Sequence, residues 1–228
     1  MAVMIAHASK DERGKINGGA AGDQTGKEVC IRAWYNRPWN VVIRFMIPEM
    51  RERFAYAMER AANNPHIGYD QYQRNTALTQ ARKVDYDPGK ISVDCETDCS
   101  ALVTLCCIYA GIPERSLYKD GNSATTTTLK ARLRATGTVD IYTSKKYTAS
   151  PDLLIRGDIL LYEGHHVACV VQGNTVADKP TPSKSITDIA REVLHGTWGN
   201  GAERVEKLTA AGYNYAEVQA EVNRLLKK

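Results

Sequence analysis

The segment from Cys99 to Tyr109 constrains the fold more than any other part of this sequence. Its side chains are mostly apolar, so a helix formed here leaves no polar face for water and belongs in a core. Asp98 and Ser100 suit the capping region at its start, and Gly111 and Pro113 are typical of a helix end. The sequence therefore predicts a buried helix over 99–109.

The period of the apolar residues changes along the chain. Helical spacing predicts further helices from Pro48 to the Asn-Asn-Pro stop, over 69–83, and up to Gly137. Short β-branched segments follow and predict antiparallel strands; they read VDIYT, DILLYE, HVACVV and NTVAD. The first 45 residues predict a long ordered loop followed by a packed segment. Helices first and a small sheet afterwards give an α+β fold.

Composition excludes several classes of protein. Lys and Arg number 30 against 26 Asp and Glu, without the basic clusters that binding to nucleic acid needs. No stretch approaches the roughly 20 apolar residues of a membrane span, so membrane insertion is not expected. The N-terminus lacks the pattern of a secretory signal, which predicts synthesis in the cytosol. The six cysteines have no regular spacing and are expected to be thiols.

A polar segment with two prolines, DKPTPSKS, divides the chain. We expect a larger domain over 1–178, a linker over 179–185 and a module over 186–228. The module has the pattern of three short amphipathic helices, broken at Gly196 to Gly201 and at Gly212.

Cys99 differs from the other cysteines because it stands at the start of the buried helix. Unpaired backbone N–H groups and the helix dipole stabilise a thiolate at this position. Cys106 and Cys107 fall deep in the helix, where thiols pack and are inert. Cys99 is thus a candidate nucleophile, although a small core residue would fit the same spacing.

A catalytic cysteine needs an imidazole to accept its proton, and that imidazole needs an orienting partner. His166 begins the segment HVACVV, and its alternation with Ala168 and Val170 places it on one face of a strand. His165 belongs to the preceding turn and is the alternative. Asp178 ends the segment NTVAD, and a hairpin of the two segments would bring Asp178 beside His166.

TDCSALV, RGDILLY and HHVACVVQGNTVAD together resemble the NlpC-type, papain-like cysteine peptidases of bacterial cell walls. The resemblance covers about Asp94 to Asp178. It implies that Cys99 is the nucleophile, His166 the base and Asp178 the orienting residue, with no cofactor. The family usually has His, Asn or Gln at the third position and Gly where Ala101 stands.

The same family often has a tyrosine upstream of the cysteine that shapes the substrate site. Tyr69 is the candidate here, and Tyr72 and Tyr86 compete with it. Asp23 and Gln24 lie in the Gly-rich loop, which we expect to line the substrate cleft. That loop lacks the spacing of a phosphate-binding loop. A zinc site from Cys95, Cys99, His165 and His166 is disfavoured by the spacing of these residues.

The tail is similar to the CW-seven type of cell-wall-binding repeat found in phage lysins, on the segments GTWGNGAER, LTAAGYNY and VQAEVNRLL. The resemblance implies binding to the glycan and the muramyl peptide stem of peptidoglycan. The candidate contacts are Trp198, Asn200, Arg204, Tyr213 and Gln219. Trp198 and Tyr213 are equally explained as core anchors of a very small helical module.

The two resemblances imply a phage endolysin that hydrolyses an amide of peptidoglycan and stays in the cytoplasm of the host bacterium until lysis. An endopeptidase acting next to D-glutamate is the first expectation. An N-acetylmuramoyl-L-alanine amidase with the same triad is the alternative. A wall-binding protein without catalysis, and an acyltransferase or transglutaminase, are the other classes considered. The sequence predicts no oligomeric state.

Overall fold

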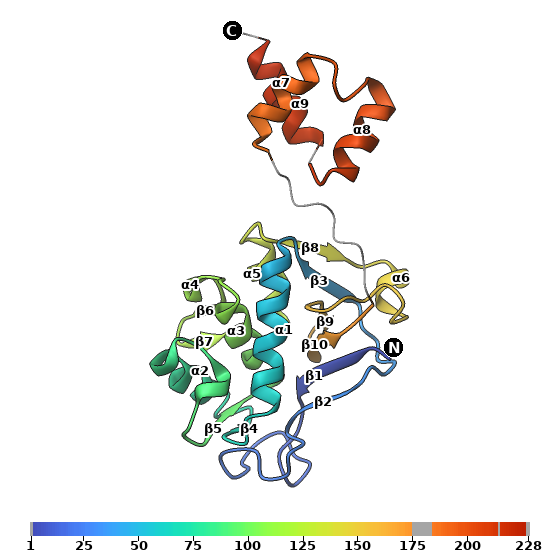
Figure 1. Cartoon of the computed structure of the whole chain (residues 1–228). Coiled ribbons are helices and arrows are strands. Elements are labelled where there is room, and N and C mark those ends of the chain that lie inside the picture. The colour runs from blue at the N-terminus through green and yellow to red at the C-terminus, as the bar shows by residue number, and fades with distance from the viewer. Residues whose placement is uncertain (1, 175–183, 214, 227–228) are drawn as a thin grey trace. The chain divides into compact units, whose positions relative to one another are not determined.

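The computed structural model describes residues 2–174, 184–213 and 215–226 and forms two compact units, Met1–Thr175 and Val176–Lys228 (Figure 1). The first unit is mixed α and β, with an antiparallel sheet and several helices, which confirms the α+β class. No helix in the described ranges is both long and apolar enough to cross a membrane.

The main sheet has six strands in the order β2-β1-β10-β9-β3-β8, all paired antiparallel. The strands are β1 (Met4–Ala8), β2 (Val29–Ala33), β3 (Val41–Phe45), β8 (Val139–Tyr142), β9 (Ile159–Tyr162) and β10 (His166–Gln172). β10 lies inside the sheet, with β9 on one side and β1 on the other.

The N-terminal segment corrects the expected order of helices before strands. Residues 1–45 supply β1, β2 and β3, half of the sheet, instead of only a loop and a packed segment. These strands are short, so the alternation of apolar residues in each was too brief to predict a strand. Both neighbours of β10 are described strands, β1 and β9, and the strand expected up to Asp178 lies outside the described residues from position 175 on. Asp178 itself lies outside the described residues.

Two helices pack on one face of the sheet. α1 (Pro48–Ala62) and α3 (Cys99–Tyr109) contact each other and β10, and both were predicted from the sequence. Their fully buried side chains include Phe54, Met58, Leu102 and Leu105. The opposite face has its own apolar cluster, which contains Ile5, Trp39, Ala168 and Val170. The sheet is thus covered on both sides.

The prediction of a single helix over 69–83 is mostly wrong. Residues Ile67–Tyr69 form β4, which pairs in parallel with β5 (Cys95–Thr97), and only Thr76–Ala81 forms α2. The burial of Ile67 and Tyr69 beside β5 favours a strand at this position over the helix that the spacing of apolar residues predicts. The remaining elements are η1 (Arg82–Val84), η2 (Pro88–Lys90), α4 (Glu114–Leu117), β6 (Tyr118–Lys119), β7 (Asn122–Ser123), α5 (Leu129–Arg134) and α6 (Lys145–Thr148).

The described part of the second unit contains α7 (Ile186–Leu194), α8 (Gly201–Ala210) and α9 (Tyr215–Leu225). Ser185 caps α7 by accepting a hydrogen bond from the Asp188 backbone N–H at 3.1 Å. These helices share one apolar cluster, which includes Ile189, Leu208, Tyr213 and Val222.

Candidate active site

The N-terminus of α3 is closed by its own capping residue. Asp98 Oδ1 accepts hydrogen bonds from the backbone N–H groups of Ser100, at 2.9 Å, and Ala101, at 2.7 Å. Cys99 is therefore the first helical residue, and its side chain is buried against the sheet. The cap uses two of the free N–H groups that a helix N-terminus offers.

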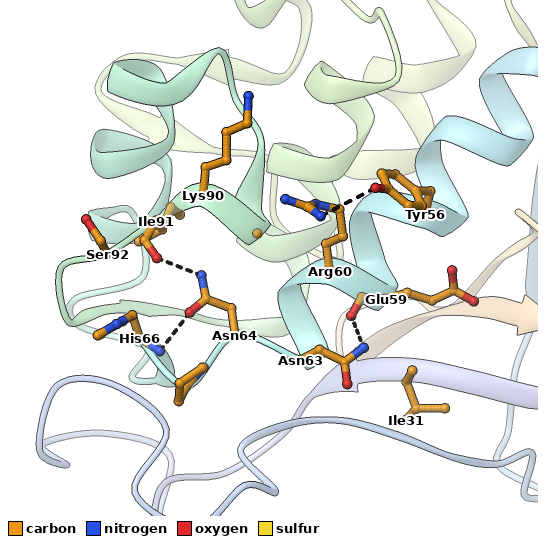
Figure 2. Close-up of a pocket in the computed structure, with 12 residues that line it drawn as sticks. Ile31, Tyr56, Glu59, Arg60, Asn63, Asn64, His66, Lys90, Ile91 and Ser92 are labelled. Carbon is orange, nitrogen blue, oxygen red and sulfur yellow. Dashed lines mark hydrogen bonds between the residues drawn. The ribbon is translucent and has the colours of Figure 1, made fainter.

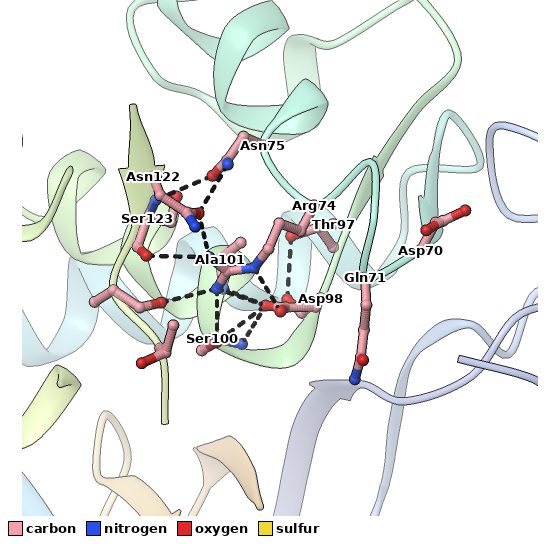
Figure 3. A network of polar contacts seen from close by, with 12 residues as sticks. Asp70, Gln71, Arg74, Asn75, Thr97, Asp98, Ser100, Ala101, Asn122 and Ser123 are labelled. Carbon is pink, nitrogen blue, oxygen red and sulfur yellow. Dashed lines mark hydrogen bonds and ion pairs between the residues drawn. The ribbon is translucent and has the colours of Figure 1, made fainter. Parts of the chain in front are cut away.

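Arg74 fixes this cap from outside the helix (Figure 3). Its Nε lies 2.6 Å from Asp98 Oδ2, and its Nη2 donates to Asp98 Oδ1 at 3.1 Å and to Ser100 Oγ at 2.8 Å. Its guanidinium also donates to the carbonyl oxygens of Ser123 and Ala124. One buried cation thus joins the start of α3 to the β7 segment. Arg74 could not be recognised from the sequence, because its partners lie 24 or more residues away.

The electrostatics of Cys99 differ from the sequence expectation of a stabilised thiolate. Burial, and then the charge of Asp98, raise the pKa of the Cys99 thiol to about 12. A hydrogen bond from the Val167 backbone, the charge of Arg74 and the Ser100 backbone oppose this rise in pKa without cancelling it. The free site therefore holds a neutral thiol, with its sulfur at the backbone of the residue that follows His166.

His166 is buried and bonded to a residue that sequence reasoning missed. His166 Nε2 and His7 Nδ1 lie 2.9 Å apart, and the two rings meet edge to face with centroids 5.2 Å apart. His7 lies on β1, and it shares a face of the sheet with Ile5, as His166 does with Ala168 and Val170. His7 could not be found from the sequence, because nothing marks residues 4–8 as the neighbour of β10.

Both imidazoles are held in the neutral form. Burial, then the charges of His7 and Arg37, lower the pKa of His166 to about 3. Burial, then the charges of Arg32 and Arg37, lower the pKa of His7 to about 4. One ring therefore donates its N–H to the other, and Nδ1 of His166 is left for a second partner. His165, the alternative in the turn, is exposed and stacks on Tyr162 with ring centroids 4.1 Å apart.

Of the three candidate tyrosines, the structure brings Tyr69 near Cys99. Tyr69 is 3% exposed, and burial followed by proximity to Cys99 raises the pKa of its hydroxyl. Gln71 Nε2 donates to Tyr69 Oη at 3.2 Å, which leaves the hydroxyl proton of Tyr69 free to donate. Tyr72 is 81% exposed, and Tyr86 donates to Glu114.

Asp23 and Gln24 hold the turns of their own loop. Asp23 Oδ1 accepts from the backbone N–H groups of Thr25 and Gly26, and Gln24 Nε2 donates to the carbonyl oxygen of Ala21. The loop packs closely on β4, since a Cβ on Gly68 would lie 2.4 Å from the Gly22 carbonyl oxygen. The role of the two side chains in a substrate cleft stays a prediction.

Buried carboxylates lie beneath this loop. Glu28 Oε2 accepts from the Tyr69 backbone N–H at 2.9 Å, which ties the loop to the strand that carries Tyr69. Burial, then the charges of Glu28 and Asp70, raise the pKa of Glu96 to about 8, so Glu96 is protonated at neutral pH. Among the described residues, no three His, Cys, Asp or Glu side chains are arranged to hold a metal ion.

A hollow of about 720 Å³ lies beside the end of α1 (Figure 2). Its wall contains Asn64, whose Nδ2 donates to the carbonyl oxygens of Pro88 and Ile91, and Arg60, which pairs with Asp87. Neither Cys99 nor His166 lines this hollow. Its polar side chains serve the local structure.

In the second unit, most candidate wall contacts have structural partners. Tyr213 is 4% exposed and meets Trp198 edge to face, while Trp198 Nε1 donates to Glu192 at 3.0 Å. Arg204 donates to the Gly199 carbonyl oxygen and to Asn200 Oδ1, and Gln219 donates to Asn223. Tyr213 is thus a core residue, and the binding roles of the other candidates stay predictions.

Comparison with known proteins places the chain in a family. Residues 5–177 match the model of the endolysin-like domain, so the chain belongs to the endolysin-like domain family, and residues 187–226 match the CW_7 repeat. The chain is 51% identical over 42 residues to a lysozyme of Streptococcus phage Cp-7, which is 18% of this chain and 12% of that protein. No solved structure matches the chain.

The Arg74 network generates a test of stability. Arg74→Ala leaves the buried Asp98 without its partner, so the first unit should lose about 3–5 kcal/mol of unfolding free energy. Arg82→Ala is the matched control, because Arg82 forms a more exposed pair with Glu114 and should cost about 1 kcal/mol or less. Denaturant unfolding measures both variants. Equal losses in the two variants would show that Arg74 does not hold the start of α3.

Proposed function

We propose that the chain is a peptidoglycan hydrolase of the endolysin type, in which Cys99 is the nucleophile and His166 the general base. The observation that carries the proposal is the position of Cys99. Its sulfur sits at the capped start of α3, against the backbone at the start of β10, where the buried His166–His7 pair begins. An NlpC-type, papain-like cysteine mechanism fits this arrangement.

The neutral state of both groups defines the first step. The Cys99 thiol passes its proton to Nδ1 of His166 as its sulfur attacks the amide carbonyl, so no resting ion pair is needed. The tetrahedral intermediate collapses to a thioester, and His166 returns the proton to the leaving amine. His166 then takes a proton from water, which hydrolyses the thioester and restores the thiol.

The oxyanion needs donors other than the capped amides. Asp98 already accepts hydrogen bonds from the N–H groups of Ser100 and Ala101, so these two amides are not free to bind an oxyanion. Among the described residues, the Cys99 backbone N–H has no hydrogen-bond partner, and the Tyr69 hydroxyl is free to donate. We assign these two donors to the oxyanion.

His7 is proposed as the orienting residue, the role that the sequence resemblance gave to Asp178. Its contact with Nε2 of His166 would fix that ring and leave Nδ1 for the thiol, whose sulfur lies at the backbone of Val167, the residue after His166. His7 matches the NlpC-type family in residue type, since histidine is usual there, but it departs from the family in position, because it lies on β1 and not after the base. The second unit is proposed to bind the glycan and the peptide stem, with Trp198, Asn200, Arg204 and Gln219 as candidates. We propose cleavage of the stem next to D-glutamate, release from the host cytoplasm at lysis, and no cofactor.

Replacing Cys99 tests the function. Cys99→Ala and Cys99→Ser should abolish the release of soluble fragments from purified walls while leaving wall binding intact. Cys30→Ser is the control, because Cys30 is a half-buried thiol on β2 and should retain full activity. Mass spectrometry of the fragments distinguishes an endopeptidase from an N-acetylmuramoyl-L-alanine amidase. Undiminished lysis by Cys99→Ala would exclude the thiol mechanism.

Replacing His7 tests its orienting role. His7→Ala should lower kcat about 10- to 100-fold with little change in KM, since it leaves the general base present but misoriented. His7→Asn can still hydrogen-bond to His166 and should recover part of the loss. His165→Ala should have no effect. If His165→Ala removed activity and His7→Ala did not, the assignment of the base would be wrong.

A further inference from the structure

Two arginines lie beside the histidine pair without a carboxylate partner. Arg32 pairs with Ile5 across the β1–β2 ladder, so Arg32 projects from the same sheet face as His7. Its guanidinium lies over the Tyr35 ring, 4.6 Å from the centroid, and Arg37 donates to Tyr35 Oη at 3.3 Å. In the described part of the chain, neither arginine forms an ion pair with Asp or Glu.

The segment that carries Arg37 is hydrogen-bonded at both ends and lies next to His166. Trp39 is 4% exposed, its ring centroid lies 6.0 Å from that of His166, and its Nε1 donates to the Tyr35 carbonyl oxygen at 3.3 Å. The backbone N–H of Trp34 donates to Val3, and that of Asn40 donates to Leu161, so both ends of the segment are fixed to the sheet. Such preorganised cations are suited to binding an anion.

The local charge is positive and uncompensated. The sequence from Val29 to Pro48 contains no Asp or Glu. Both histidines feel the charge of Arg37, and His7 also feels that of Arg32. An anion that binds here could therefore pair with Arg32 and Arg37 without displacing a carboxylate from either side chain.

We propose that Arg32 and Arg37, backed by Tyr35 and Trp39, form a subsite for a free carboxylate of the peptide stem, close to the amide that is cut. This inference rests on the proposed function and names its substrate class: stems that carry a free α-carboxylate at D-glutamate rather than a carboxamide. A charge-assisted contact of this kind corresponds to a preference of about 10- to 100-fold.

The test compares two peptides that differ in a single group. Muramoyl-L-alanyl-γ-D-glutamyl-L-lysine carries the free α-carboxylate, and its D-isoglutamine counterpart carries a carboxamide. Calorimetric binding to the full chain with Cys99→Ala should show one site, separate from any binding by the second unit, that favours the carboxylate by about 10-fold or more. Adding Arg37→Gln or Arg32→Gln should bring the ratio close to one, and Arg37→Lys should keep part of it. Arg115→Gln, an exposed arginine of α4, should leave the ratio unchanged.

Measurements of binding and of turnover distinguish a failure of this inference from a failure of the proposed function. If the carboxylate preference is present but the unmutated chain cuts neither peptide, the subsite stands and the proposed function fails. If the chain cuts both peptides and binds them equally, the subsite is excluded and the hydrolase stands. Retention of the full preference in both Arg37→Gln and Arg32→Gln, or its loss in Arg115→Gln, would also overturn the subsite. If a phosphate-bearing wall polymer competed with both peptides, and the carboxylate peptide bound no better than the carboxamide peptide, the two arginines would bind another anion and the proposal would be overturned.

Discussion

The pairing of β1 with β10 is the interaction on which the candidate site depends. It joins residues at opposite ends of the first unit and puts His7 within 2.9 Å of His166. The same ladder continues through β2, which brings Arg32 to the same face. Without the N-terminal strand, His166 would lie at an open sheet edge with no orienting partner. The N-terminal segment is therefore part of the chemistry that we propose.

Burial gives the site a resting state different from that of a preformed thiolate–imidazolium pair. The pKa of Cys99 is raised to about 12 and that of His166 is lowered to about 3, so the proton stays on sulfur until a substrate arrives. A neutral thiol is also less readily oxidised than a thiolate, because the thiolate is the reactive form. In the mechanism that we propose, proton transfer coincides with attack, and Arg32 and Arg37 stay available to the substrate.

The sequence was most informative where local pattern and burial agree. The helices over 48–62 and 99–109 follow from their apolar spacing and their end signals, and Asp98 was recognisable as a cap. The strand that begins at His166 was also predicted. The neighbours of that strand were not predicted, because strand pairing between residues 5 and 170 leaves no pattern in the sequence near either residue. For the same reason His7, Arg32, Arg37 and Arg74 were missed. Asp178, which the resemblance implies as the orienting residue, lies outside the described residues.

Trapping the acyl-enzyme tests the central claim most directly. Walls are digested with the unmutated chain, the reaction is stopped in acid within milliseconds to seconds, and the digested protein is examined by mass spectrometry. The account predicts a stem-peptide fragment joined as a thioester to the peptide that contains Cys99, and to no other cysteine peptide. The account would be contradicted if the reaction were stopped while walls were still being cleaved and no covalent adduct were found on Cys99.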